Sequence, residues 1–469
     1  MQNNIITLTD SYKFGHWNQY PPGTEYVYSY FEARTGATFS YTVFFGLQYL
    51  LKEYLAGSVV TREHIETAAR LSEKHFGNPR IFNRHMWEHI LQRHNGRLPV
   101  RIRAVPEGTP IPVGNVMMTV ENTDPACFPL TNHLETLLSH VWYGSTVATL
   151  SRKVKERLKE FLELTADSEK GLPYMLHDFG FRGASCVEAA GVGGAGHLVN
   201  FMGTDNAKAI EVAMAYYNSD VCASSVPATE HSIMTALGPE GEESIIGRLV
   251  TEYPSGTLSV VSDSYDIFKT CEMIIGGALR EKILARDGVL VVRPDSGEPI
   301  ATILKVLDIL GEKFGLTVNR KDYKILNPKI RILWGDGLSY DMIDDILLAM
   351  RDANWSAENM ATFGMGGGLL QKVNRDTQRF AFKCSAQCRN GVWHDIFKEP
   401  LDKSKSSKKG KLALIRSTDG QSAMYKTVPA AELHDGEDLL VTVFEDGALT
   451  HEWTFDEVRR NASLYSFSG

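Results

Sequence analysis

The chain has 469 residues, of which 43% are hydrophobic and 23% charged, which is the composition of an ordinary globular protein with room for more than one domain. Its formal net charge of -8 excludes the broad basic face of a nucleic-acid-binding protein, so an anionic ligand must be held by individual Arg and Lys side chains. The first residues lack the features of a signal peptide, and no apolar run approaches the ~18 residues of a membrane span. We therefore expect a cytoplasmic protein with no nucleic-acid partner and no membrane partner.

The first ~130 residues have the pattern of a β-rich segment. Residues 97–122 alternate apolar and polar side chains and are interrupted by Pro and Gly turns. Before them, His85 and His89 stand four residues apart on a predicted helix, but without the HExxH pattern they indicate a partly exposed helix face rather than a metal site.

From about residue 174 the chain repeats a β-branched run, a polar or glycine-rich turn and a segment with helical periodicity. Such β-turn-α units predict parallel strands, in an open doubly wound sheet or in a barrel. A polar residue or glycine ends nearly every strand, at intervals of roughly 30 residues, the length of one strand-helix unit. In a barrel these strand ends converge on one mouth. They are Asp178, Asp205, His231, Asp263, Asp295, Asp336 and Gly366.

GVGGAG, residues 191–196, matches the pattern GxGxxG, but we expect packing glycines rather than a dinucleotide site. The fingerprint needs a preceding strand and a following helix. Here the preceding SCVEAA has a helical pattern, and the following HLVNFMG has the pattern of a strand.

Three later motifs carry chemistry. VVRPDSG delivers Arg293 and Asp295 on one face of a strand, beside the strand ends of Asp263 and Asp336. Clustered carboxylates of this kind are typical of a polyhydroxylated or Mg²⁺-chelating ligand, although an Arg-Asp ion pair closing a strand is the alternative.

GDG (335–337) and GMGGG (364–368) are turns whose backbone N–H groups suit phosphate, and sharp turns that simply need glycine are the alternative. Arg375, Lys383 and Lys398 follow the second of them. His231, in SVPATEHS, is expected to be an acid-base or phosphate-contacting imidazole at the mouth, or otherwise a core or capping residue.

The last ~85 residues again have a β pattern, with a hairpin expected around Asp446-Gly447 in residues 439–455. We expect both ends of the chain to fold together. The predicted division is 1–130 and 384–469 for a β-rich domain and 131–383 for an α/β barrel. The six cysteines are scattered, and isolated thiols are favoured over a zinc site or a disulfide framework.

Taken together, these motifs resemble the nicotinamide phosphoribosyltransferases, which are type II phosphoribosyltransferases. The resemblance runs nearly from end to end and in the same order. The motifs that carry it are TDSYK, YPPGTEYVYSYFEAR, HDFGFRG, NFMGTDN, SVPATEHS, VSDSYDI, RPDSG, GDG, FGMGGGLLQK and FKCS.

The resemblance implies an irregular α/β barrel with a second, β-rich domain, and a pentosyltransferase that converts nicotinamide and phosphoribosyl pyrophosphate into nicotinamide mononucleotide and pyrophosphate. It also implies Mg²⁺, stimulation by ATP, and a homodimer in which residues 9–34 reach the partner's active site.

The site residues follow from the same resemblance. Phe179 stacks on one face of the pyridine ring, and Tyr12 of the other subunit covers the opposite face with Asp10 beside it. Arg182, Asp205 and Arg293 surround the carboxamide and the ribose phosphate, while Asp263 and Asp295 take ribose and metal positions. Further implied contacts to the substrate come from Ser259, Gly335, Asp336, Gly366, Gly367 and Arg375.

His231 is implied to be phosphorylated by ATP, and Lys383 and Lys398 to lie near pyrophosphate or the ATP phosphates. The chain departs from the family pattern at Phe181, where relatives carry Tyr, and at Met365, where they carry Ser.

Asp205 bears on the choice of substrate. A carboxylate accepts a hydrogen bond from the amide of nicotinamide and repels the carboxylate of nicotinate, so we expect nicotinamide to be preferred. The alternatives are a nicotinate phosphoribosyltransferase, a catalytically silent nucleotide-binding barrel and an Mg²⁺-dependent barrel lyase.

Overall fold

The computed structural model describes residues 3–399, 406–417, 425–433 and 436–463. The chain divides into two compact units. The first comprises residues 1–149, 212–220 and 374–469, and the second comprises residues 150–211 and 221–373. Where the sequence placed boundaries at 130 and 383, the structure thus divides the chain at 149 and 373, the first of these inside helix α6 (Val141–Thr165).

The second unit is built on a six-stranded parallel sheet with the order β7-β6-β13-β12-β9-β8. Its longer strands are runs of Val, Ile and Leu because a sheet covered on both faces is apolar throughout, and Val260, Val292 and Ile332 are fully buried. The strands are β6 (Leu176–Asp178), β7 (Gly203–Thr204), β8 (Ser255–Val261), β9 (Asp287–Arg293), β12 (Ile330–Trp334) and β13 (Met360–Met365).

One short segment closes this sheet into a barrel. Ser224 forms a parallel bridge with Gly203 of the edge strand β7, and Ala228 forms another with Ser259 of the opposite edge strand β8. Hydrogen bonds from Thr204 N to Ser224 O (3.2 Å) and from Ser259 N to Pro227 O (2.9 Å) hold the two bridges. The expectation of an irregular barrel is confirmed.

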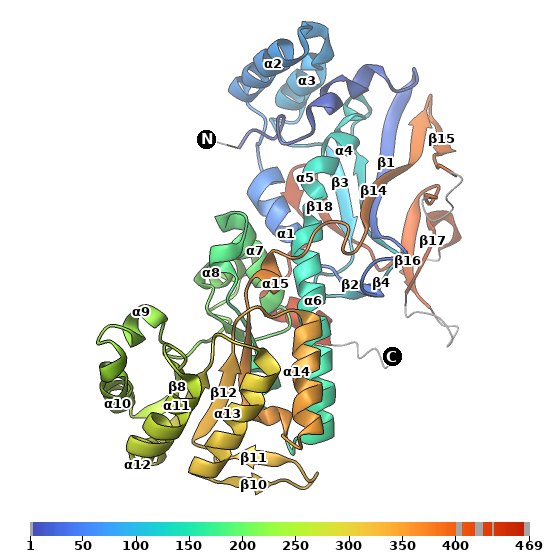
Figure 1. The fold of residues 1–469 in the computed structure, drawn as a ribbon. Coiled ribbons are helices and arrows are strands. Elements are labelled where there is room, and N and C mark those ends of the chain that lie inside the picture. The colour runs from blue at the N-terminus through green and yellow to red at the C-terminus, as the bar shows by residue number, and fades with distance from the viewer. Residues whose placement is uncertain (1–2, 400–405, 418–424, 434–435, 464–469) are drawn as a thin grey trace. The chain divides into compact units, whose positions relative to one another are not determined.

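Helices follow the strands, as the alternating pattern predicted (Figure 1). One of them, α13, begins with Glu298 capping the N–H groups of Ile300 and Ala301 and packs against β12 and α14. The helices of this unit include α7 (Val187–Leu198), α9 (His231–Met234), α10 (Glu242–Glu252), α12 (Arg280–Leu284), α13 (Pro299–Phe314), α14 (Tyr340–Asp352) and α15 (Gly367–Leu370).

GVGGAG lies inside helix α7. The prediction of a strand for HLVNFMG is wrong, because the first two residues of this segment complete the helix and β7 begins only at Gly203. The glycines serve packing. A Cβ at Gly194 would lie 2.5 Å from Asn206 Nδ2 and 2.9 Å from Asp178 Oδ2. Glycine therefore lets α7 approach two polar side chains beneath the barrel mouth.

The first unit contains a seven-stranded antiparallel sheet with the order β15-β14-β1-β5-β3-β18-β19. It combines the two ends of the chain, which confirms the expected β-rich domain. Asp446 and Gly447 form the predicted hairpin turn, both with positive φ. The strands are β1 (Thr24–Ala33), β3 (Val100–Ala104), β5 (Val116–Asn122), β14 (Phe380–Arg389), β15 (Val392–Asp395), β18 (Val441–Glu445) and β19 (Ala448–Leu449).

Smaller elements complete the first unit. The paired strands are β2 (Tyr41–Val43) with β4 (Pro110–Pro112) and β16 (Leu412–Arg416) with β17 (Tyr425–Pro429). Its helices include η1 (Ser11–Asn18), α1 (Leu47–Leu50), α2 (Arg62–Phe76), α3 (Arg84–Arg93), η4 (Pro125–Cys127), α4 (Leu130–His133), α5 (Glu135–Leu138) and α16 (Phe455–Ser463).

A buried carboxylate anchors residues 212–220, which end helix α8 (Ala207–Tyr217), in the first unit. Glu107 accepts hydrogen bonds from Tyr217 Oη (2.8 Å), Gly46 N (2.8 Å) and Gln48 N (2.6 Å). Burial raises the pKa of Glu107, although these donors oppose the shift. The donors satisfy a group that would otherwise be costly to bury.

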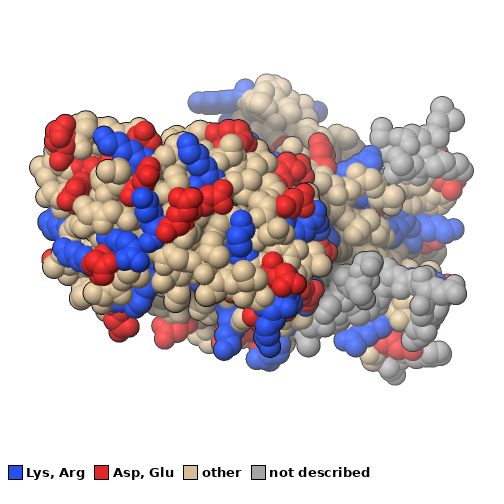
Figure 2. Space-filling model, turned by 60° about the horizontal axis from the view of Figure 1, so that its bottom comes forward, with Lys and Arg blue, Asp and Glu red and all other residues tan. Residues whose placement is uncertain are grey.

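Acidic and basic side chains are interspersed over the face of the molecule in Figure 2. Among the described residues, none of the helices combines the length and the apolar character that crossing a membrane requires.

Candidate functional site

The polar residues and glycines that follow five of the six barrel strands gather around one mouth, a pocket of about 850 Å³. It is bordered by the turns after β6, β7, β9, β12 and β13, which the sequence had placed at one end of the barrel. Of the residues singled out in the sequence, it is lined by Asp178, Phe179, Phe181, Arg182, Asp205, Arg293, Asp295, Gly335, Asp336, Gly366 and Gly367.

A second cavity, of about 340 Å³, lies among the barrel strands. Its wall is largely apolar, with Val226, Val291 and Leu333 among the lining residues, and Ser259 is also part of it. The two cavities share Phe179, Asp205 and Arg293. These three side chains therefore stand between a polar mouth and a narrower apolar chamber.

Phe179 is held in place by backbone and ring contacts. Its N–H donates to Met365 O (3.1 Å), and the Arg293 guanidinium lies 5.3 Å from its ring centroid. A Cβ on Gly364 would lie 2.0 Å from the ring, so the aromatic side chain rests directly on the backbone of β13. The ring is half-buried and presents part of its surface to the pocket.

The carboxylate of Asp178 lies fully buried beneath Phe179. Its Oδ1 accepts a hydrogen bond from Gly180 N (2.7 Å) and its Oδ2 accepts one from Asn206 Nδ2 (2.8 Å). Burial raises the pKa of Asp178 to about 6, and the charge of Asp205 adds to the rise while the two donors oppose it. Asp178 therefore joins the turn after β6 to the turn after β7.

Asp205 keeps its negative charge at the boundary of the two cavities. Ser225 Oγ donates to Asp205 Oδ1, and His177 Nδ1 lies 3.8 Å from the same oxygen. Burial raises the pKa of Asp205, but the contacts with His177 and Ser225 and the charge of Arg293 outweigh burial, and the pKa is lowered. An ionised acceptor thus faces the chamber.

The charged residues at the next strand ends form a connected series. Arg293 donates through Nε (3.2 Å) and Nη2 (3.0 Å) to Asp295 Oδ1, and Asp295 N donates to Asp263 Oδ2 (3.0 Å). The other oxygen of Asp263 lies 3.2 Å from His231 Nε2. Asp263 is nearly buried and His231 half-exposed, so the carboxylate orients an accessible imidazole. Neither of these two residues lines the two cavities.

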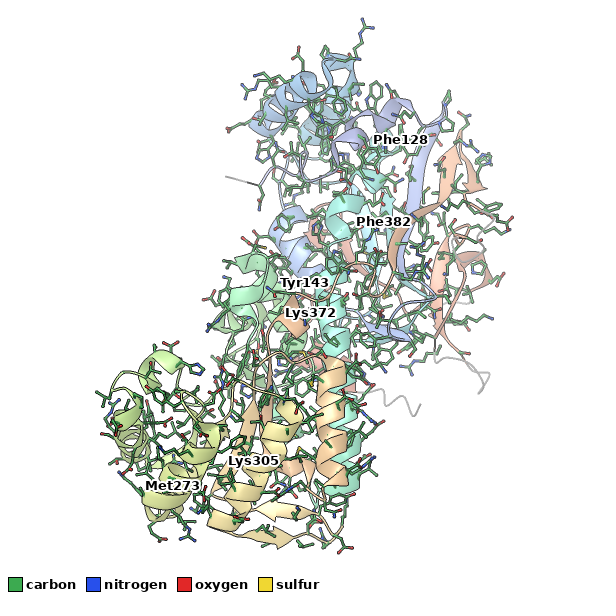
Figure 3. All side chains as sticks on the ribbon, viewed as in Figure 1. Phe128, Tyr143, Met273, Lys305, Lys372 and Phe382 are labelled. Carbon is green, nitrogen blue, oxygen red and sulfur yellow. The ribbon has the colours of Figure 1, made fainter. Side chains whose placement is uncertain are left out.

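Two glycine turns form the remaining part of the mouth. Trp334 Nε1 donates to Asp336 O (2.7 Å) and fixes the first turn. The second turn begins α15, whose first N–H groups have no acceptor within the helix. A Cβ at Gly368 would lie 2.2 Å from Leu338 O, so the two turns approach each other closely. Lys372, labelled in Figure 3, follows α15 and lines the pocket.

Asp10 and Tyr12 belong to the first unit, at the beginning of η1. Asp10 Oδ2 accepts a hydrogen bond from Thr136 Oγ1 (2.7 Å). Tyr12 is 58% exposed, with its ring edge to face against His16.

The first unit also contains a cationic cluster, which we define as Arg34, Arg375, Lys383 and Lys398. Burial lowers the pKa of Lys383, and the charges of the other three members lower it further, while Glu135 raises it. Like charges brought together at a partly buried position are costly unless an anion offsets them.

Four residues of these sites were not singled out from the sequence. His177 and Ser225 contact Asp205, Lys372 lines the mouth, and Arg34 joins the cationic cluster. His177, Lys372 and Arg34 lie inside or beside motifs that had already drawn attention, so proximity to those motifs was the available signal. Ser225 opens the motif SVPATEHS, but its contact with Asp205 became visible only in the closed barrel.

Comparison with known families gives two matches. Residues 174–448 match the model of the nicotinate phosphoribosyltransferase family, and residues 4–102 match the N-terminal domain of nicotinamide phosphoribosyltransferase.

Two curated relatives match almost the whole chain, and both are named nicotinamide phosphoribosyltransferase. The one from Xanthomonas campestris pv. campestris is 46% identical, with 98% of each chain covered. The one from Acinetobacter baylyi is 34% identical, with 97% of this chain and 96% of the relative covered.

Solved structures share the fold at lower identity. Nicotinate-nucleotide pyrophosphorylase from Pyrococcus furiosus superimposes with a TM-score of 0.62 at 16% identity, covering 98% of this chain and 95% of that one. Human nicotinic acid phosphoribosyltransferase gives a TM-score of 0.61 at 16% identity, covering 97% and 93%.

Proposed function

This chain belongs to the nicotinate phosphoribosyltransferase family and, within it, to the nicotinamide phosphoribosyltransferases, and we propose that it transfers the phosphoribosyl group of 5-phosphoribosyl 1-pyrophosphate to nicotinamide. The products are nicotinamide mononucleotide and pyrophosphate, a step of NAD salvage. The observation that carries the proposal is the position of Phe179 and the ionised Asp205 between a polar mouth and an apolar chamber.

The arrangement suits a reaction that depends on positioning. The ring nitrogen of nicotinamide carries a lone pair and needs no base to attack C1 of the ribose. A pyridine ring stacked on Phe179 would have its nitrogen directed toward the mouth. The bond to pyrophosphate breaks as the carbon-nitrogen bond forms, and the oxocarbenium-like ribose is stabilised by nearby carboxylates such as Asp295.

The phosphate groups have suitable donors in the same mouth. The backbone N–H groups of the two glycine turns, after β12 and β13, are suited to the 5-phosphate of the ribose. Arg182 and Lys372 line the pocket and can offset negative charge. The apolar chamber behind Phe179 keeps water away from the reacting carbon on that side.

The electrostatics favour nicotinamide over nicotinate. Asp205 can accept a hydrogen bond from the amide, whereas a substrate carboxylate would face a like charge. Arg293 could attract nicotinate, but its guanidinium donates two hydrogen bonds to Asp295, which offsets much of its charge. The nicotinate-specific alternative is therefore not favoured.

The carboxylates fit a Mg²⁺ ion that arrives with the pyrophosphate. Mg²⁺ keeps several waters and binds through one or two carboxylates together with substrate phosphates. Asp295 lines the mouth and suits that role. Both oxygens of Asp263 already interact with protein groups, so Asp263 would act through water or by orienting His231. The ion would supply charge to the departing pyrophosphate.

We further propose that ATP stimulates the reaction through His231. Asp263 orients this half-exposed imidazole, which suits a residue that accepts a phosphoryl group. The cationic cluster of the first unit suits the phosphates of ATP or the pyrophosphate.

A homodimer with shared sites is part of the proposal. Tyr12 exposes most of a large aromatic side chain, which suits a ring offered to the pyridine pocket of a second copy. Mixing inactive Tyr12→Ala and Phe179→Ala subunits should restore part of the activity, because half of the mixed sites would carry neither substitution. Mixed subunits as inactive as the separate variants would rule out sharing.

The reaction is tested by incubating the purified chain with phosphoribosyl pyrophosphate and Mg²⁺ and offering nicotinamide or nicotinate, each with and without ATP. We expect nicotinamide mononucleotide from nicotinamide, formed faster with ATP. A preference for nicotinate would overturn the role of Asp205, and no turnover of either base would favour the silent nucleotide-binding barrel.

A further inference from the structure

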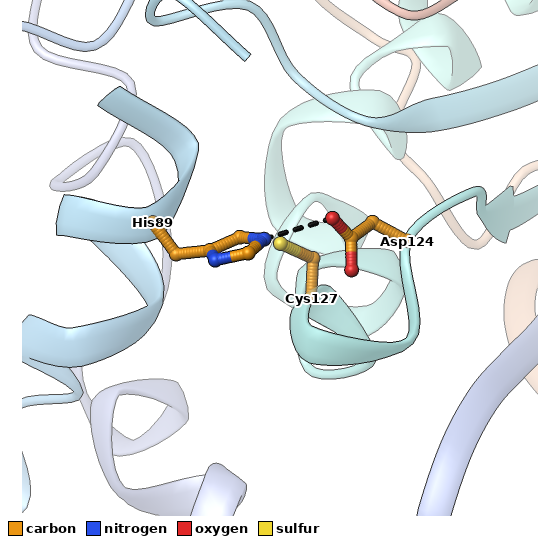
Figure 4. A group of neighbouring side chains, drawn as sticks. All are labelled: His89, Asp124 and Cys127. Carbon is orange, nitrogen blue, oxygen red and sulfur yellow. Dashed lines mark hydrogen bonds and ion pairs between the residues drawn. The ribbon is translucent and has the colours of Figure 1, made fainter. Parts of the chain in front are cut away.

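A second group of chemically active side chains lies in the first unit, where two helical segments meet. His89 Nε2 and His94 Nε2 lie 2.8 Å and 2.7 Å from the same oxygen, Asp124 Oδ2. The ligand-type atoms of His89, Asp124 and Cys127 all lie within 4.8 Å of one another. Figure 4 shows the imidazole, the carboxylate and the thiol pointing toward one another. Among the described residues, this is the one group of three or more potential ligand atoms that lie so close together.

Rigid local structure holds each of these side chains. His89 lies on α3, which is capped by Asn83, and His94 ends the same helix with its N–H bonded to Ile90 O. Asp124 caps η4, with its Oδ1 accepting from Ala126 N (2.8 Å), so its Oδ2 is directed toward the histidines. Cys127 ends η4 and is completely buried.

The donor set is typical of one class of metal ion. One imidazole nitrogen, one carboxylate oxygen and one cysteine sulfur form the group, and the second imidazole, of His94, contacts the same carboxylate. Such donors suit tetrahedral Zn²⁺ and its substitute Co²⁺, with the cysteine binding as the thiolate after release of its proton, whereas Mg²⁺ prefers oxygen ligands alone. Bond lengths of ~2.0–2.3 Å place neighbouring zinc ligands somewhat farther apart than the present N···O distances. An ion would therefore enter after side-chain rotations that separate Asp124 from the two imidazoles and bring His94, which lies outside the group of three, to the ion.

We propose that His89, His94, Asp124 and Cys127 form a binding site for a thiophilic divalent cation of the Zn²⁺ class. Bound there, the ion joins the end of α3 to η4. These elements are distant in sequence, since His94 and Asp124 are 30 positions apart. This role is structural and does not depend on the reaction proposed above, because none of the four residues belongs to the two cavities of the barrel.

The test uses the full chain, stripped of metal with a chelator and titrated with Co²⁺. We expect one Co²⁺ per chain with the visible bands of tetrahedral cobalt and a near-ultraviolet sulfur-to-cobalt band, both lost when Zn²⁺ is added and unaffected by excess Mg²⁺. Cys127→Ser should abolish the sulfur band. His89→Gln should weaken Co²⁺ affinity by more than about 100-fold, because even an outer partner is worth 10–100-fold.

Two matched variants serve as controls. His85 lies one turn before His89 on the exposed side of α3, and Cys186 is an exposed thiol in the other unit. His85→Gln and Cys186→Ser should bind Co²⁺ as the unmodified chain does. If Cys127→Ser fails to fold, judged by far-ultraviolet circular dichroism, the half-exposed His94→Gln replaces it, with the same expected loss of affinity.

The absence of saturable Co²⁺ binding by the unmodified chain would overturn the proposal and leave the four residues as a hydrogen-bonded cluster. Equal binding by His89→Gln and His85→Gln, or a sulfur band that survives Cys127→Ser and disappears in Cys186→Ser, would equally overturn it.

Discussion

Asp178 and Asn206 are linked by a buried hydrogen bond of 2.8 Å between Oδ2 and Nδ2. The first residue precedes the aromatic Phe179 in the chain, and the second follows the acceptor Asp205. One contact therefore sets the spacing between the group proposed to stack on the pyridine ring and the group proposed to recognise its amide.

Replacing Asn206 with Ala should impair binding of the base more than the chemical step. The side chain also donates to Ala190 O (2.9 Å), so its loss removes two buried hydrogen bonds and leaves Asp178 Oδ2 without its donor, at a cost of about 1–3 kcal/mol in the free energy of unfolding. The shift of Asp205 should raise KM for nicotinamide by about tenfold or more.

Steady-state kinetics and urea unfolding measure the two effects. Asn319→Ala is the control, because Asn319 donates to Thr165 O elsewhere in the same unit. It should lower stability and leave KM unchanged. A matching rise in KM for both variants would contradict the positioning role.

The pH dependence should reflect Asp178. Its pKa of about 6 lies above the free value of 3.8, so the folded chain binds the proton more tightly than the unfolded chain does. Its contribution to stability is therefore greatest below pH 3.8 and is lost as the pH rises toward 6.

The protonated carboxyl of Asp178 has one acceptor fewer for its two hydrogen-bond donors, so kcat/KM for nicotinamide should fall as the pH drops through about 6. A profile of kcat/KM against pH that is the same in Asp178→Asn would count against this assignment.

Asp205→Asn should narrow the preference between the two pyridine bases. Removal of the charge relieves repulsion of nicotinate and weakens the hydrogen bond to the amide of nicotinamide. The measurement is the ratio of kcat/KM for nicotinamide to that for nicotinate. Ser225→Ala removes a hydrogen bond to Asp205 while keeping the charge, and it should preserve most of the preference. An unchanged ratio in Asp205→Asn would remove Asp205 from substrate discrimination.

Phe179→Ala should raise KM for nicotinamide strongly, because the ring face that the pyridine stacks on is lost. Phe179→Leu separates stacking from packing, since leucine fills much of the volume without a ring, and it should also bind poorly. Phe179→Tyr keeps the face and should bind well. Near-normal kinetics of Phe179→Ala would refute the stacking role.

Gly368→Ala should impair use of phosphoribosyl pyrophosphate. The added Cβ would lie 2.2 Å from Leu338 O and would force apart the two glycine turns proposed to hold phosphate. We expect a higher KM for phosphoribosyl pyrophosphate with a smaller change for nicotinamide. Gly171→Ala, where a Cβ meets nothing within 4 Å, should behave as the unmodified chain. Equal kinetics of the two variants would argue against close packing of the turns.

The strand ends were predictable because a parallel barrel repeats a local pattern. Each β-branched run ends in a polar turn, and the geometry of the sheet brings those turns together without further information from the sequence. Asp205, Asp295 and Gly366 were therefore placed at the mouth from their positions in the repeat.

The remaining features depend on contacts between distant segments. Tyr217 joins the first unit through Glu107, a pairing across 110 positions that no local pattern indicates. His89 and Asp124 meet across 35 positions. Gly194 of GVGGAG must be glycine because the side chains of Asp178 and Asn206 lie against α7 at that position. Nothing in the sequence indicated that Asn206 would be one of these two neighbours.

The closing segment of the barrel bears on how such a protein diversifies. Residues 224–228 complete the wall with two isolated bridges, while the other strands form continuous ladders. Ser225 and Val226 belong to this closing segment and line the chamber. Because the ladders do not run through it, substitutions there can change the depth and polarity of the chamber and leave the scaffold intact. Evolution can thus alter which heteroaromatic base is admitted by substituting a few residues of this closing segment.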